Sequence, residues 1–225
     1  MIEFLKGYED YFGDWVLEMA IASLVTMELM LLSFILACAL GLVIALMRIS
    51  QFSVLSGLTK VYIGFFRGVP VLVILYWIYF AMPELGYKVL LISSFTAAVL
   101  GLGIHGSAFL AEVFRSGIEA LDQGQMEAAL SLGMTPARAM RFIILPQAAR
   151  VVLPPMANYS VGLLKETALC SIIAVPELML RAKDVSSSSF LPMHAFVLAA
   201  VFYYIMSFPM MRLVEHLEAK MAVGQ

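Results

Sequence analysis

The sequence predicts an all-α polytopic membrane protein with five transmembrane helices. Hydrophobic residues make up 62% of its 225 residues and charged residues only 13%, whereas charged residues make up about 25% of a typical soluble domain. In addition, five stretches are apolar over the roughly 20 residues that a helix needs to cross a bilayer. These observations favour a single transmembrane domain over residues 1–225, surrounded by the lipid bilayer.

The expected spans lie at about residues 22–47, 61–82, 89–114, 151–174 and 194–214. The connection at about residues 115–150 is the only long one on its side of the membrane, and it is polar enough to lie in water. On the opposite side, the connection from Arg181 to Pro192 holds the serine run Ser186–Ser189 and is expected to be a solvated loop. An odd number of spans disfavours two equal inverted halves, the usual plan of secondary transporters.

Basic residues indicate how the spans are oriented, because Lys and Arg are enriched in cytoplasmic connections. The side that holds residues 115–150 carries nine of them and the other side four, with Lys165 inside a span and not counted. The nine are Arg48, Lys60, Arg67, Arg115, Arg138, Arg141, Arg150, Arg212 and Lys220, and the four are Lys6, Lys88, Arg181 and Lys183. We therefore expect the N-terminus outside, and both residues 115–150 and the C-terminus in the cytoplasm.

Composition and motifs disfavour several other functions. The net charge of −2 gives no electrostatic footprint for a nucleic-acid partner. Cys38 and Cys170 lie in apolar stretches without metal-ligand spacing, so we expect buried hydrophobic side chains and no metal site. The glycines of residues 101–106 match a dinucleotide fingerprint by letters only, since they lie within an expected span. Because the sequence has no Walker A motif, we expect this chain to bind no cofactor and to hydrolyse no ATP itself.

The long cytoplasmic connection is predicted to hold two short helices. Good helix formers run through residues 125–132, and Gly133 suits the left-handed C-cap that ends a helix. Thr135 is a good N-cap and Pro136 a good first helical residue, so a second helix should start there and end before Pro146. From spacing alone, an ordinary cytoplasmic hairpin without a partner remains an alternative.

The residues of this connection resemble the EAA loop of ABC importer permeases, in particular those of the polar amino acid uptake family. The ordered match consists of Gly124, Gln125, Glu127, Ala128, Ala129, Gly133, Leu145, Pro146 and Pro154. Three other stretches resemble elements of the same family. Phe66–Pro70 is similar to FRGTP, with Val69 in place of Thr, and Ala111–Ile118 is similar to AEIxRGGI. Leu163–Leu169 is similar to LLKDTSL, with Glu166 in place of Asp.

This resemblance implies the type I ABC importer permease fold in a bacterial inner membrane. The protein would import polar amino acids by alternating access, and residues 175–184 are most similar to the branch for basic amino acids and opines. The implied partners are an ABC ATPase dimer that holds ATP and Mg²⁺, a second permease chain (identical or paralogous) and an extracytoplasmic substrate-binding protein. The implied ATPase-docking helix is made by Gly124, Gln125, Glu127, Ala128, Ala129, Leu132 and Gly133.

Polar side chains inside the expected spans are candidates for the substrate pathway, because a charge at mid-membrane costs about 2.5–3.5 kcal/mol unless it has a partner or a water-filled path. The candidates are Glu28, His105, Asn158, Lys165, Glu166 and Thr167. Lys165 suits contact with a substrate carboxylate, or a structural tether in a broken helix. Glu166 suits an ammonium group, and Glu28 suits either a cationic cargo or the outer interface. His105 and Asn158 suit the path or packing between helices.

A stand-alone channel or proton-coupled carrier is the alternative, with Glu28, Glu166 and His105 as its ion path. It leaves the residues around Glu127 without a role. Glu112 and Arg115 do not belong to either path, since they lie three residues apart on one helix face and are expected to pair with each other.

Overall fold

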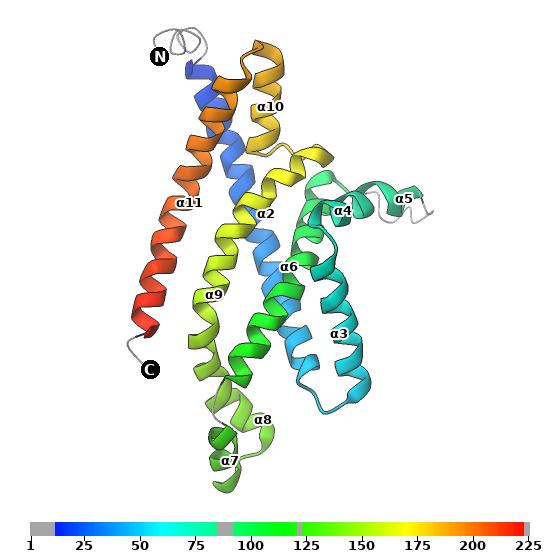
Figure 1. Ribbon diagram of the computed structural model, residues 1–225, viewed down its shortest axis with the longest axis vertical. Helices are drawn as coiled ribbons and strands as arrows, with labels where there is room; N and C mark the ends of the chain where they lie inside the picture. The colour runs from blue at the N-terminus through cyan, green and yellow to red at the C-terminus, as the bar shows by residue number, and fades with distance from the viewer. Residues whose placement is uncertain (1–11, 85–91, 121–122, 223–225) are drawn as a thin grey trace.

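The computed structural model describes residues 12–84, 92–120 and 123–222, and these form helices and short connections with no β-strand. The long helices run side by side in an elongated bundle (Figure 1). Two short helices, α7 (Gln123–Ser131) and α8 (Pro136–Ala139), lie at one end of the bundle, and α10 (Leu178–Ser189) lies at the other.

Within the described residues, three helices are long and apolar enough to cross a membrane: α2 (Phe12–Arg48), α6 (Ser94–Glu119) and α11 (Pro192–Ala222). They contain the first and fifth expected spans and residues 94–114 of the third; residues 92–93 precede α6, and residues 89–91 lie outside the described residues. A fourth long helix, α9 (Leu145–Glu166), runs between α6 and α11 and holds most of the fourth expected span (Figure 1). Polar residues such as Asn158 and Lys165 make α9 less apolar than the other three.

The second expected span, residues 61–82, is not one straight helix. The chain forms α3 (Ser53–Gly68) and then bends by 101° into α4 (Val71–Tyr76), a π-helical turn (Trp77–Ala81) and α5 (Met82–Glu84). Val69, with φ −97° and ψ 130°, has the extended backbone that a following proline imposes. Pro70 supplies no backbone N–H, so α3 cannot continue through it. Consequently, α4 and α5 lie across the bundle and project from it (Figure 1).

The fourth span ends in irregular backbone before α10 begins. After Glu166 the helix tightens into a 3₁₀ segment, Thr167–Ile173, and Ala174 adopts the left-handed conformation with φ 59°. The solvated loop expected from Arg181 to Pro192 is wrong, because α10 covers the serine run up to Ser189. α10 packs against α2 and α11, and this packing outweighs the weak helix propensity of consecutive serines.

Small residues bring α2, α6 and α9 close together. A Cβ added to Gly41 of α2 would lie 3.1 Å from the carbonyl oxygen of Ser107 and 3.2 Å from the backbone nitrogen of Ala111, both on α6. A Cβ on Gly117 of α6 would overlap Val152 of α9. The helices are therefore in close contact at these two positions, and there is no room for a larger side chain at Gly41 or Gly117 unless the helices move apart.

Candidate functional site

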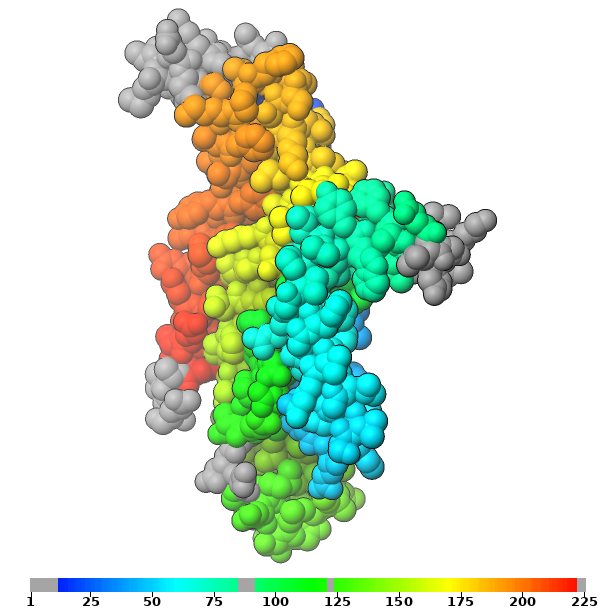
Figure 2. All heavy atoms as spheres, turned by 45° about the vertical axis from the view of Figure 1, so that its right-hand side comes forward, coloured from blue at the N-terminus to red at the C-terminus, as the bar shows by residue number. Residues whose placement is uncertain are grey.

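At the end of the bundle, the first short helix ends where the sequence predicted, and the second short helix begins where the sequence predicted. Gly133 has φ +81°, and the first helix ends in a Schellman motif, in which Met134 donates to the carbonyl of Ala129 at 3.1 Å and Gly133 to that of Leu130 at 2.9 Å. The Thr135 side chain caps the second helix by accepting from the backbone N–H of Arg138 at 3.4 Å. This pair of short helices forms a separate lobe in the space-filling view (Figure 2).

The second short helix does not end before Pro146 as expected. After α8 the backbone passes through a π-helical segment, Met140–Ile144, and continues directly into α9 at Leu145. The change of hydrogen-bond register places Pro146 in the first turn of α9, where a backbone N–H is not needed. The lobe is therefore connected to α9 by continuous helical backbone rather than by a loop.

Among the α7 side chains that the structure describes, one is buried and most of the others are exposed. Ala129 is 4% exposed, whereas Leu132 is 84% exposed. Gly124, Gln125, Glu127 and Ala128 are also exposed. Of these, the Gln125 side-chain oxygen lies 3.5 Å from the Gln147 side-chain nitrogen of α9, which also donates to the carbonyl of Ile143 at 3.0 Å. An exposed leucine beside small residues, on a helix whose position is fixed by a buried alanine, is suited to contact with another protein.

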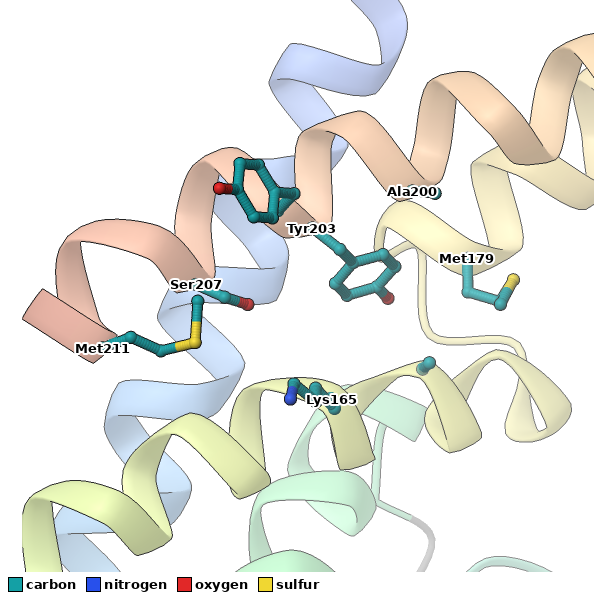
Figure 3. Close-up of a pocket in the computed structure, with 8 residues that line it drawn as sticks. Lys165, Met179, Ala200, Tyr203, Ser207 and Met211 are labelled. Carbon is teal, nitrogen blue, oxygen red and sulfur yellow. The ribbon is translucent and has the colours of Figure 1, made fainter.

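A cavity of about 400 Å³ lies between α9 and α11 at the level where α9 ends (Figure 3). Its lining is mostly apolar, and its polar or charged lining residues are a lysine, two tyrosines and a serine. The lining residues are Lys165, Ala168, Met179, Ala200, Tyr203, Tyr204, Ser207 and Met211. No hydrogen-bond or ion-pair partner of the Lys165 side chain occurs among the described residues.

The other pathway candidates lie elsewhere. Glu28 is exposed on α2 and Asn158 is exposed on α9, whereas His105 and Glu166 are half-buried. Thr167 is buried and its hydroxyl donates to the carbonyl of Leu164 at 2.7 Å. Within the described part of the chain, His105 Nδ1 and Glu166 Oε2 are buried without a hydrogen-bond partner. Of the six predicted residues, the structure brings only Lys165 to the cavity.

Sequence reasoning missed a buried polar cluster around Glu177, which joins four elements beside the cavity. The Glu177 carboxylate is fully buried and accepts hydrogen bonds from the backbone N–H groups of Met179 at 2.9 Å and Leu180 at 2.8 Å, which caps α10. It also accepts from the Tyr203 hydroxyl of α11 at 2.9 Å. The next backbone N–H, of Leu178, donates to Thr26 of α2 at 3.0 Å.

Burial raises the pKa of the Glu177 carboxyl, and the hydrogen bonds from Met179, Leu180 and Tyr203 together with the charge of Lys183 oppose that rise. Lys183 itself donates to the Ser171 hydroxyl at 2.8 Å, which ties α10 to the 3₁₀ segment. No sequence signal pointed to this cluster, because Glu is not among the preferred N-cap residues. Thr26 had no signal either, since its partner lies 152 residues away.

We expect Glu177→Ala to lower the stability of the folded chain by about 2 kcal/mol, since it leaves two partly buried N–H groups and one tyrosine hydroxyl without an acceptor. Thermal denaturation in detergent, followed by loss of the monodisperse peak, measures the effect. Tyr203→Phe is the matched variant: it removes one donor and should cost no more than about half as much. Equal stability of the wild type and Glu177→Ala would show that the cluster does not hold α10 in place.

Ion pairs complete the polar interactions of the bundle. Arg115 pairs with Glu112 and Glu119 at the end of α6 that lies near α7, as expected for Glu112. At the opposite end, Arg181 of α10 pairs with Glu18 of α2 at 2.6 Å. Among the described residues, no group of three or more His, Cys, Asp or Glu side chains is placed to hold a metal ion.

Comparison with known proteins identifies the family. Residues 37–223 match the family described as "Binding-protein-dependent transport system inner membrane component". The probable amino-acid ABC transporter permease protein PatM of Vibrio harveyi is 41% identical over 179 residues, which are 80% of this chain and 80% of that protein. The arginine transport system permease protein ArgU of Corynebacterium glutamicum is 38% identical over 213 residues, 89% of this chain and 66% of that protein.

Solved structures share the fold. The chain is similar to the crystal structure of an amino acid ABC transporter with histidines, with a TM-score of 0.85 and 34% identity over 93% of this chain and 96% of that one. An inward-facing conformation of the MetNI methionine ABC transporter has the same fold, with a TM-score of 0.66 and 18% identity over 93% of this chain and 98% of that one. This chain therefore belongs to the family of binding-protein-dependent transport system inner membrane components, and it is a multi-pass membrane subunit of an ABC importer.

Proposed function

We propose that this subunit imports polar amino acids by alternating access, and that an ATPase dimer drives it through α7. The observation that carries the proposal is α7 itself: a short helix at one end of the bundle, held by Ala129, with its remaining surface exposed. The excess of basic residues at this end supports a cytoplasmic position for α7 and for the C-terminus, with the N-terminus outside. The names of the relatives support amino acids as cargo.

The exposed face of α7 is suited to a protein groove. Ala128 and Gly124 present little side-chain volume, so another backbone can approach closely, and Leu132 offers apolar area to bury. Glu127 is exposed beside them and is available for an ion pair with a basic residue of the ATPase. ATP and Mg²⁺ would bind to the ATPase, which changes its shape on binding and thereby biases the membrane subunit.

The cavity beside Lys165 is our candidate for a station on the cargo's path. An amino acid carries one carboxylate and one ammonium group, and the lysine provides a charge for the first in a largely apolar site. Glu166, one residue further, points about 100° away around the helix axis and so faces a different neighbour. Glu28, His105, Asn158 and Thr167 stay predictions as pathway residues.

The complete importer would contain a second permease chain, identical or paralogous, and an extracytoplasmic binding protein that delivers the cargo. The stand-alone channel or carrier considered from the sequence has lost its support, because the family consists of subunits of binding-protein-dependent systems. Alternating access needs two halves that move relative to each other, and one copy of this bundle supplies only one half.

Reconstitution into proteoliposomes tests this proposal. The chain is assembled with the ATPase and the second permease chain that co-purify with it, the extracytoplasmic binding protein is supplied on the cargo side, and uptake of radiolabelled amino acids (arginine, histidine, glutamine and leucine) is measured with ATP or with a non-hydrolysable analogue. ATP-dependent uptake of polar amino acids, with leucine excluded, is the expected result. Uptake that persists without the ATPase would contradict the docking role, and uptake of leucine alone would contradict the cargo class.

We expect Lys165→Met to lower amino acid uptake by about tenfold or more, because a hydrogen bond to a charged group contributes about 1.5–3 kcal/mol. Lys165→Arg keeps the charge in the cavity and should retain more uptake. The ATPase activity of the assembled importer separates the two roles considered for this residue. If Lys165 contacts cargo, basal ATP hydrolysis stays near the wild-type rate. If Lys165 only fixes the broken end of α9, both uptake and hydrolysis fall together.

A further inference from the structure

The segment Val71–Glu84, which we term the crossing segment, is too short to span a bilayer and too apolar to lie in water. It comprises α4, the π-helical turn and α5. Residues 71–83 contain no charged side chain, and the first charge is Glu84. An uncharged stretch of about 10–14 residues is typical of a buried or interfacial helix, whereas a span needs about 20.

One face of the crossing segment packs on the bundle. Val71, Ile74, Leu75 and Ile78 are buried in the main hydrophobic cluster, at the spacing of one helix face. The approach is close, since a Cβ added to Gly101 of α6 would lie 2.7 Å from a methyl carbon of Leu75. This face holds the segment across the bundle, near the end of α6 that lies away from α7 (Figure 1).

The opposite face is equally apolar and has nothing covering it among the described residues. Val73, Tyr76, Trp77 and Phe80 are 52%, 43%, 48% and 46% exposed, and they follow the same helical spacing. The Tyr76 and Phe80 rings stack with their centroids 5.5 Å apart. With Ala81 and Glu84 these four side chains surround a shallow hollow of about 360 Å³. A helix that is apolar on both faces needs protein or lipid on the second one.

The chemistry and direction of this face fit lipid at the membrane surface. Tryptophan and tyrosine are enriched at bilayer interfaces, where an apolar ring with a polar edge meets both surroundings. The 101° bend after α3 turns the segment from the direction of the spans into the plane of the membrane. Glu84 is exposed at the end of the segment, where a charge is able to reach water.

We propose that the crossing segment lies flat in the extracytoplasmic interface of the bilayer, with Tyr76, Trp77 and Phe80 inserted between phospholipid headgroups and acyl chains. Trp77 then lies about 15 Å from the bilayer centre, which is half the thickness of the hydrocarbon core. The segment thereby fixes the depth of α3 and α6 in the membrane, in the way that aromatic anchors fix other spans.

Fluorescence quenching tests the depth, because the chain has only two tryptophans. Trp15→Phe leaves Trp77 as the sole tryptophan, whose emission is excited selectively over that of the tyrosines, and the full chain is placed in phospholipid nanodiscs that carry a nitroxide either near the headgroup or at the end of the acyl chain. We expect the shallow nitroxide to quench Trp77 at least about twofold more strongly than the deep one. Trp77→Phe is the matched control, since Trp15 is 6% exposed and should respond little to either.

Stronger quenching by the deep nitroxide would overturn the proposal in favour of a spanning segment. No quenching by either would also overturn it: accessibility to aqueous acrylamide would then indicate water, and protection from acrylamide would indicate a cover such as a second copy of this chain. If Trp15→Phe does not accumulate, Phe80→Trp on the Trp77→Phe background gives the same information by its difference from Trp77→Phe alone. None of these measurements depends on cargo or on the ATPase.

Discussion

Replacing Gly133 by proline is expected to reduce ATP-driven uptake by at least about tenfold while the chain still inserts into the membrane. Gly133 has φ +81°, which proline, fixed near −65°, cannot adopt. Proline also lacks the N–H that donates to the carbonyl of Leu130 at 2.9 Å. α7 has nine residues, fewer than the about 12–15 that a helix needs to persist on its own, so the lost turn should change its position. If this displacement weakens the coupling between the ATPase and the membrane subunit by about 1.4 kcal/mol, the effect already corresponds to a tenfold loss.

The control for this prediction is Gly133→Asn, because asparagine tolerates the left-handed conformation. Nothing lies within 4 Å of a Cβ added at Gly133, so asparagine meets no steric obstacle. Uptake by Gly133→Asn should remain close to that of the wild type. Co-purification of the ATPase with each variant shows whether docking or a later step is lost. Wild-type uptake by Gly133→Pro would contradict the role assigned to α7.

Replacing Gly41 by leucine is expected to destabilise the bundle by about 3 kcal/mol and to lower its thermal midpoint by about 5–10 °C. The new side chain would begin 3.1 Å from the Ser107 carbonyl oxygen and 3.2 Å from the Ala111 nitrogen. Both atoms belong to the backbone of α6, so a change of side-chain rotamer does not relieve the contact, and α2 and α6 would have to separate. Fluorescence-detected size-exclusion chromatography after heating gives the midpoint.

Gly64→Leu is the matched control for Gly41→Leu. Gly64 lies on α3, is exposed, and has no atom within 4 Å of an added Cβ. The two substitutions add the same side chain to a helix in the same membrane protein, so only the packing differs. A similar midpoint for both variants would mean that α2 and α6 are not packed as closely as described.

The sequence predicted well those features that depend on local chemistry. Gly133, Thr135 and Pro136 have the conformations or caps expected of them, because each is determined by the backbone of one or two residues. Length and apolarity likewise sufficed for α2, α6 and α11. The pairing of Arg115 with Glu112 followed from their spacing on one helix.

Features that depend on the direction of the chain in space were missed. Hydropathy predicted one span through α3 and α4, because a bend in the chain leaves the apolar content of the sequence unchanged. Pro70 was the only local sequence feature that indicated the bend. α10 was taken for a loop, since its helix is stabilised by Glu177, Thr26 and Tyr203, which come from three different parts of the chain.

The candidate site was only partly predictable for the same reason. A mid-membrane charge identifies Lys165 as unusual, but which polar residues share a cavity with it depends on how α9 and α11 are rotated. The cavity therefore contains Tyr203 and Ser207 of α11, for which no sequence signal existed, and not Asn158 of α9.

The continuous helical backbone from the α7–α8 lobe into α9 allows a rotation of the lobe to displace the far end of α9. Gln147 and Lys165 are 18 residues apart on it, or about 27 Å at 1.5 Å per residue. A tilt of about 5° at the lobe then displaces the Lys165 end by about 2.4 Å, enough to open or close a contact with a small molecule. Pro154 and Pro155 interrupt the hydrogen bonds between these ends, which places a hinge within the arm. The stiffness of that hinge therefore determines how much of a displacement at the α7–α8 lobe reaches the cavity beside Lys165.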